Sequence, residues 1–178
     1  AIMTTDTVAK EAVQLASGYV VGGMAKGAGM LAPALATMLV FITTDADVDS
    51  VTCDAALRES TRMTFDRLDS DGCQSTNDTV ILMASGASGI KPDPDEFAAA
   101  VRSVCQKPSA PLLADAEGAD PQITIDVIGP DGDVDAPDVG RSVAPPHLFT
   151  CAGFATAPHR APPLAPARPR TADSTRPQ

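Results

Sequence analysis

The apolar residues of the N-terminal part of the chain gather in short runs separated by polar or glycine-containing segments. Val13–Ala16 and Tyr19–Val21 are two such runs, with Ser17-Gly18 between them, and they predict two short strands. We expect Gly22-Gly23 to end the second strand and to lead into a loop. A third run, Met38–Ile42, has the composition of a buried strand and is too short to cross a membrane.

The segment after the third run predicts a helix and then a further strand. Residues 45–50 are a polar turn with helix-capping residues, and a helix is expected from about Val51 to Asp66. The face that this helix is expected to bury consists of Val51, Ala55, Ala56 and Met63. The apolar run Val80–Ala84 then predicts a strand, and a glycine-containing loop follows at 85–89.

A second helix is predicted to begin at Asp93, which would cap it, with Pro94 in the first helical position. Three apolar residues fall on one face of this helix: Phe97, Val101 and Val104. The helical pattern degrades beyond Gln106, because Pro108 and Pro111 would each cost ~3 kcal/mol in a helix interior.

Composition narrows the classes of protein that fit. A chain of 178 residues corresponds to one domain and at most part of a second, and its apolar content of 44% is enough for a core. Because aromatic residues make up only 3%, that core is expected to be aliphatic. The net charge of -10 argues against a nucleic-acid partner, and no membrane-spanning segment is expected.

The four cysteines are scattered, at Cys53, Cys73, Cys105 and Cys151, and none forms a C-x-x-C pair. Zinc-type spacing is therefore absent and no metal site is predicted. We interpret the cysteines as reduced thiols of a cytoplasmic protein. The chain opens without a signal peptide and also without a starting methionine, which suggests a processed or partial chain.

The stretch with the clearest chemistry is Lys26–Leu39, with the sequence KGAGMLAPALATML. Its two glycines permit positive φ or close approach to a ligand, and its proline excludes a helix. Thr37 therefore stands where an irregular loop enters a buried strand, and its hydroxyl could be a nucleophile held on a rigid element. A threonine hydroxyl needs a base, and the free α-amine of an N-terminal threonine can supply it.

This stretch resembles the self-cleavage segment of the ornithine acetyltransferase family, the ArgJ family of arginine biosynthesis. The family pattern is Lys-Gly-x-Gly-Met-x-x-Pro-x-x-Ala-Thr-Met-Leu, and every fixed position is matched. The resemblance implies a cut between Ala36 and Thr37, after which Thr37 is the acyl-accepting nucleophile. It also implies a mixed, layered α/β sandwich of the self-processing N-terminal-threonine type, with the strand after Thr37 at its centre.

Three further motifs carry the resemblance. Met3–Thr7, with the sequence MTTDT, matches a family segment whose first threonine contacts substrate, which implies this role for Thr4. Ser75–Thr79 matches a family segment of unassigned role. Residues 115–118, with the sequence DAEG, match a segment whose glutamate binds substrate, which implies this role for Glu117. In the family, the helix begun at Asp93 continues as far as this segment.

The implied reaction moves acetyl from N-acetylornithine to Thr37 and then to glutamate. Lys26 is suited to a substrate carboxylate or to developing negative charge, and Glu117 to a substrate ammonium group, although either could instead form a surface salt bridge. Some family members also use acetyl-CoA as donor, a point that the sequence leaves open; no other cofactor is expected. Family members associate as two α and two β chains.

The resemblance assigns 1–36 to the end of an α chain and 37–150 to the first part of a β chain. The oxyanion hole and some binding groups of the family lie outside this chain, so the chain alone is not expected to be active. Residues 151–178 alternate proline with arginine, and we expect disorder or a shifted reading frame there. Two other hypotheses remain open: that the protein is a self-processing N-terminal-nucleophile amidase or aminopeptidase, or that it is an inactive, truncated chain.

Overall fold

The computed structural model describes residues 2–27, 38–68 and 77–115, together with Ile125, Val127 and Gly140. The chain divides into two units, 1–120 and 121–178, and the regular elements below all belong to the first. They are β1 (Lys10–Leu15), β2 (Val20–Lys26), β3 (Leu39–Thr44), α1 (Ser50–Met63), the short 3-10 helix η1 (Phe65–Arg67), β4 (Thr79–Ala84) and α2 (Pro94–Ala114).

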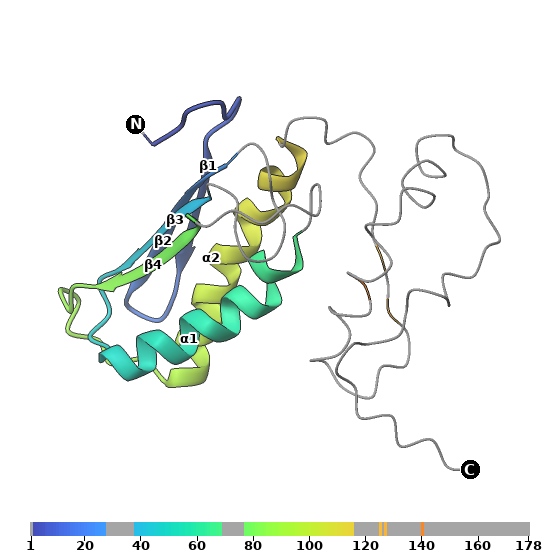
Figure 1. Cartoon of the computed structure of the whole chain (residues 1–178). Coiled ribbons are helices and arrows are strands. Elements are labelled where there is room, and N and C mark those ends of the chain that lie inside the picture. The colour runs from blue at the N-terminus through green and yellow to red at the C-terminus, as the bar shows by residue number, and fades with distance from the viewer. Residues whose placement is uncertain are drawn as a thin grey trace, which may run out of the picture. The chain divides into compact units, whose positions relative to one another are not determined.

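The four strands form one mixed sheet in the order β1-β2-β3-β4 (Figure 1). β1 pairs with β2 and β2 with β3 in antiparallel fashion, whereas β3 and β4 are parallel. The parallel pair is joined through α1, as a crossover between parallel strands requires. The strand predicted from Met38–Ile42 is therefore confirmed as an interior strand of the sheet.

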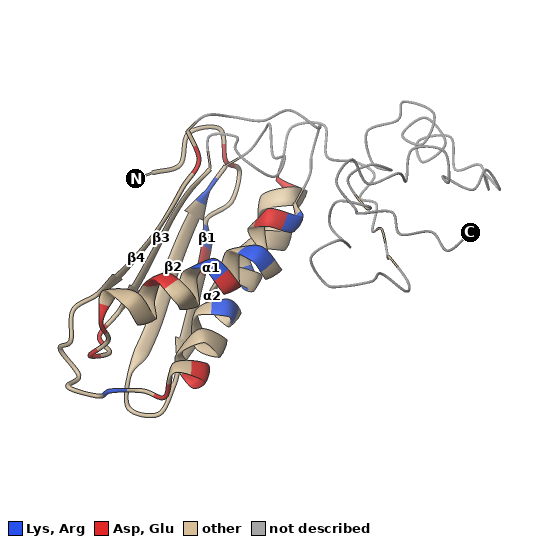
Figure 2. Ribbon diagram, turned by 60° about the horizontal axis from the view of Figure 1, so that its bottom comes forward, with Lys and Arg blue, Asp and Glu red and all other residues tan. Residues whose placement is uncertain are grey.

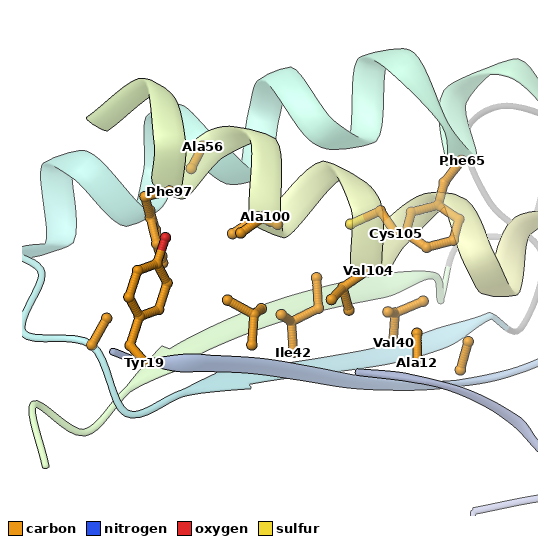
Figure 3. Close-up of a cluster of buried hydrophobic side chains, with 14 of the residues drawn as sticks. Ala12, Tyr19, Val40, Ile42, Ala56, Phe65, Phe97, Ala100, Val104 and Cys105 are labelled. Carbon is orange, nitrogen blue, oxygen red and sulfur yellow. The ribbon is translucent and has the colours of Figure 1, made fainter. Parts of the chain in front are cut away.

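Both helices cover the same face of the sheet and pack against each other (Figures 1 and 3). α2 lies over β1 and β2, and α1 reaches β4. Figure 3 shows Tyr19 and Ile42 pointing from the sheet toward α2, where Phe97 and Tyr19 meet with ring centroids 6.3 Å apart. The core is aliphatic apart from these rings and Phe65, as the composition predicts.

The start of α2 agrees with the sequence prediction in detail. The Asp93 side chain accepts hydrogen bonds from the backbone N–H groups of Asp95 and Glu96, and Pro94 is the first helical residue. The three apolar residues predicted to share its buried face are buried: Phe97, Val101 and Val104.

The end of β2 differs from the prediction, because the strand continues through Gly22-Gly23 to Lys26. The glycines serve packing there and do not terminate the strand. A Cβ added at Gly23 would come within 2.6 Å of a Val104 methyl group, so the missing side chain lets α2 approach the sheet.

The buried face of α1 was predicted correctly at Ala56 and incorrectly at Val51 and Ala55. Val51 is 75% exposed and Ala55 is exposed, whereas Ala56 and Ser60 are buried. The buried Ser60 hydroxyl donates to the carbonyl of Ala56 within the helix, and this satisfies its polar group. A serine can therefore occupy a core position that hydrophobicity alone would not assign to it.

α2 continues to Ala114 although Pro108 and Pro111 lie inside it. The residue-level prediction of degradation beyond Gln106 is therefore wrong, and the longer helix implied by the family resemblance is confirmed. Pro108 and Leu112 are buried, so burial of the last turns offsets part of the cost of the two prolines.

The second face of the sheet carries no helix among the described residues, and several of its apolar side chains are exposed, among them Val13, Leu15, Met24 and Met83. On the helical layer, acidic and basic residues are interspersed and do not form a patch of one sign (Figure 2). Within the described part of the chain, neither helix combines the length and the apolar character that a bilayer crossing requires.

Candidate functional site

The ends of β2 and β3 are neighbours in the sheet. Lys26, the last residue of β2, pairs with Leu39, the first residue of β3. The intervening residues 28–37, which include Ala36 and Thr37, lie outside the described residues, and so does Glu117. The two strands thus fix both ends of the segment in which the sequence predicts the cut.

Lys26 and Gly27 begin this segment, and both are buried. Gly27 has a φ of 155°, a value that side-chain-bearing residues rarely adopt. This positive φ agrees with the expectation that Gly27 gives the backbone its conformational freedom here. The backbone N–H of Gly27 donates to Asp6 Oδ1 at 2.7 Å.

A group of three buried charges lies beside Gly27, and we call Asp6, Lys10 and Asp115 the Lys10 cluster. Lys10 Nζ is 2.7 Å from Asp6 Oδ1 and 2.5 Å from Asp115 Oδ2. The side chains of Lys10, Asp6 and Asp115 are 0%, 1% and 5% exposed. The cluster joins the N-terminal segment, the start of β1 and the end of α2.

Backbone groups of the N-terminal segment complete the hydrogen bonding of the cluster. The Thr4 N–H donates to Asp6 Oδ2 at 3.3 Å. The Thr7 N–H donates to Asp115 Oδ2 at 3.0 Å, and the Thr7 hydroxyl also donates to Asp115. Each carboxylate therefore binds both the ammonium group and the local backbone.

The pKa values in the cluster favour its charged forms. Burial alone would raise the pKa of Asp6, but hydrogen bonds from Gly27 and Lys10 outweigh it and lower the pKa. The hydrogen bonds from Lys10 and Thr7 lower the pKa of Asp115 to about 2. For Lys10, burial acts to lower the pKa, but the two carboxylates raise it. At neutral pH the cluster therefore holds two negative charges and one positive charge.

Asp78 fixes the backbone on the other side of the undescribed segment. Its Oδ1 accepts the Met38 N–H at 2.6 Å, and the Met38 carbonyl accepts the Thr79 N–H at 3.0 Å. The Ser75–Thr79 motif, whose role the sequence left open, thus contributes a carboxylate that holds the residue directly after Thr37.

The structure links the predicted site residue Thr4 to the residue that follows Lys26, and it adds four residues to the candidate site. Asp6 accepts the backbone N–H groups of Thr4 and of Gly27, the residue after Lys26, while Ala36, Thr37 and Glu117 fall outside the described residues. Sequence reasoning missed Asp6, Lys10, Asp78 and Asp115 as parts of the site. One signal was available for Lys10, since a lysine occupies the same strand face as Ala12, a face that the alternation marks as buried.

Comparison with known proteins decides the family. A sequence model of the ArgJ family matches residues 1–162 of the chain. The chain belongs to the ArgJ family. The motifs at Lys26–Leu39 and Ser75–Thr79 are therefore motifs of an ArgJ-family chain and not chance matches.

Individual relatives agree with this membership. The arginine biosynthesis bifunctional protein ArgJ of Streptomyces avermitilis is 59% identical over 152 residues, which cover 85% of this chain and 40% of the relative. The proteins of the same name from Thermobifida fusca and Mycobacterium leprae are 57% and 54% identical, over 89% of this chain and 42% and 39% of their own lengths. The chain thus spans about two fifths of the relatives that it matches.

Proposed function

We propose that this chain is the central part of a glutamate N-acetyltransferase that moves acetyl from N-acetylornithine to glutamate through an acetyl-threonine intermediate on Thr37. The observation that carries the proposal is the complete match of Lys26–Leu39 to the self-cleavage pattern in a chain of the ArgJ family. The printed names of the relatives, which refer to arginine biosynthesis and to a bifunctional protein, are consistent with it.

Self-cleavage is the first proposed step. The Thr37 hydroxyl attacks the Ala36 carbonyl carbon, a C–O bond forms, the C–N bond of the peptide breaks, and the released nitrogen takes up a proton. Water then hydrolyses the ester, which leaves the Ala36 carboxylate and a Thr37 with a free α-amine. The cut is needed because an amide nitrogen has no basicity, whereas the new amine can take the hydroxyl proton.

Acetyl transfer follows in two half-reactions. The Thr37 hydroxyl attacks the acetyl carbonyl carbon of N-acetylornithine, and ornithine leaves with the proton on its amine. The amine of glutamate then attacks the acetyl ester and regenerates the Thr37 hydroxyl. In this scheme Lys26 stabilises negative charge, and Thr4 and Glu117 bind substrate; acetyl-CoA is a further candidate donor in place of N-acetylornithine.

The fixed strand ends support this chemistry. Lys26 is buried at the end of β2, and Met38 is held by Asp78 and Thr79 at the start of β3. A reacting segment with both ends fixed loses less conformational freedom when it reaches the geometry for attack. The proposed cut divides each chain into one α chain and one β chain, and the proposed assembly contains two of each.

The test uses a chimera in which residues 1–150 replace the matching segment of the Streptomyces avermitilis relative. We expect it to split between Ala36 and Thr37, and N-terminal sequencing should find Thr37 at the new terminus. The Thr37→Ala chimera should remain one polypeptide, whereas Thr43→Ala, a change in the neighbouring strand, should still be cut. A new terminus at any other residue would contradict the assignment.

The same chimera tests the transfer. Incubated with N-acetylornithine and without glutamate, it should accumulate one acetyl group on Thr37, because the second half-reaction lacks its acceptor. Peptide mapping locates the label. Release of free acetate without a glutamate requirement would favour a hydrolase instead, and acetyl on Lys26 or a cysteine would mean that the nucleophile is misassigned.

A further inference from the structure

We infer that Lys10 is a positioning residue of the proposed acetyltransferase site, and that the Lys10 cluster holds the Thr4 and Lys26-Gly27 substrate-binding segments in register with the end of α2. The expected effect of Lys10 on substrate binding rests on the proposed function, whereas the arrangement of the cluster rests on the structure alone. The residue acts through its neighbours, because its side chain is 0% exposed and its ammonium group binds two carboxylates.

The cluster is poorly explained as a device for stability. Burial of two carboxylates and one ammonium group incurs a desolvation cost for each ion, and well-packed apolar residues of similar volume often serve stability as well or better. Buried ion groups of this kind instead favour one arrangement of the segments that carry them, because every alternative leaves a charge without a partner.

The segments that the cluster joins are distant in the sequence. Lys10 and Asp115 are 105 positions apart, and Asp6 and Gly27 are 21 apart. The Asp6 carboxylate binds the Lys10 ammonium group and the backbone N–H groups of both Thr4 and Gly27. One carboxylate therefore sets the distance between a predicted substrate contact and the start of the segment that leads to Thr37.

The other carboxylate acts at the end of α2. Asp115 is the C-cap residue of the helix, two positions before Glu117, and it binds Lys10 and Thr7. Lys10 thereby links the helix end that precedes Glu117 to the segment that contains Thr4. Without the Lys10 ammonium group the two carboxylates would repel each other, and the link between these segments would open.

A first experiment tests the geometry on the 178-residue chain itself, without reference to activity. Amide hydrogen exchange is measured for Gly27 and Thr7 in the Lys10→Met and Lys10→Arg variants. We expect exchange at both amides to accelerate at least about tenfold in Lys10→Met, because Asp6 and Asp115, which accept these N–H groups, lose the cation between them and the hydrogen bonds open. Lys10→Arg should restore most of the protection, because it keeps the charge and the donors.

The matched control is Arg58→Met, which removes a cation from an exposed ion pair with Asp54 on α1. It should leave exchange at Gly27 and Thr7 unchanged. Unchanged exchange in Lys10→Met would overturn the inference. Should that variant fail to fold, Lys10→Gln provides the same test, since it removes the Lys10 charge and keeps the Asp6 and Asp115 carboxylates that accept the two N–H groups.

A second experiment tests the kinetic part on the chimera. We expect Lys10→Met to raise KM for the acetyl donor and for glutamate by about tenfold or more while kcat falls less, because binding groups are misplaced and the nucleophile is not. Val104→Ala, a core change on the sheet-facing side of α2, is the control for general destabilisation and should leave KM unchanged. Equal KM changes in both variants would reduce Lys10 to a structural role.

The two experiments distinguish a failure of the proposed function from a failure of the positioning role of Lys10. A parent chimera that neither cuts itself nor transfers acetyl would refute the proposed function, and the exchange result would still stand or fall by itself. An active chimera whose Lys10→Met variant keeps its KM values would refute the positioning role and leave the proposed function intact.

Discussion

At the scale of single residues, the carboxylate of Asp115 depends on its negative charge for its contacts with Lys10 and Thr7. The hydrogen bonds from Lys10 and Thr7 lower its pKa from the ordinary value of 3.8 to about 2. A group whose pKa is lower in the folded state contributes stability above its unfolded pKa, and this contribution is lost as the pH falls through the folded pKa.

The first prediction concerns acid stability. The free energy of unfolding of the 178-residue chain should fall between about pH 4 and pH 2, and Asp115→Asn should lower it at pH 7 and reduce its slope in that window. Urea unfolding at a series of pH values is the measurement. A difference between the two proteins that grows toward pH 2 would contradict the assigned sign.

Asp78 is the second residue with a defined task, because it accepts the N–H of the buried Met38. Asp78→Ala would leave that donor without its acceptor, and we expect a loss of about 1–3 kcal/mol in the free energy of unfolding. Asp78→Asn keeps an acceptor oxygen and should lose less. The control is Asp54→Ala, which removes an exposed pair and should change stability by less than about 0.5 kcal/mol.

At the scale of elements, the contact between α2 and the sheet depends on one of two adjacent glycines. A Cβ at Gly23 would lie 2.6 Å from Val104 Cγ1, whereas a Cβ at Gly22 would lie 3.8 Å from its nearest neighbour, Thr43 Oγ1. The two glycines are on opposite faces of β2, so only Gly23 faces the helix.

This pair gives a matched prediction. Gly23→Ala should destabilise the chain by about 1–3 kcal/mol through overpacking, and adding Val104→Ala should recover part of the loss. Gly22→Ala should be neutral or stabilising by up to about 1 kcal/mol, because it restricts the unfolded chain without a clash. Chemical denaturation of the four proteins is sufficient, and equal effects of the two glycine substitutions would disprove the packing role.

At the scale of the whole molecule, the proposed cut falls between two paired strands. β2 precedes it and β3 follows it, and six residue pairs join them, from Val21–Thr44 to Lys26–Leu39. The core also mixes both pieces, since Tyr19 and Val21 pack in the same cluster as Ile42 and Phe97. A break in the connecting segment therefore leaves the sheet and the core in place.

The corresponding prediction is that the two pieces stay together after a cut. A protease site placed within residues 28–36 of the 178-residue chain allows this to be tested without self-cleavage. After digestion, both pieces should elute as one species in size-exclusion chromatography in native buffer and separate in concentrated guanidinium chloride. Separation in native buffer would show that the covalent link between β2 and β3 holds the fold together.

The sequence by itself determined the features that a few adjacent residues encode. Asp93-Pro94 marks the start of α2 because an N-cap and an N1 proline act within one turn. The apolar run Met38–Ile42 predicts β3, and the complete motif at Lys26–Leu39 identifies the family and its expected nucleophile. These signals are local, so they survive without knowledge of the fold.

The tertiary structure alone decided the features that depend on residues far apart in the chain. A glycine fits inside β2 at position 23 because Val104, 81 positions later in the sequence, occupies the space of the missing side chain. Pro108 and Pro111 stay helical because the end of α2 packs on the core, a gain that helix propensity does not contain. Lys10 is a charged residue on a strand face that alternation marks as buried, and only the convergence of Asp6 and Asp115 makes the burial of its charge favourable.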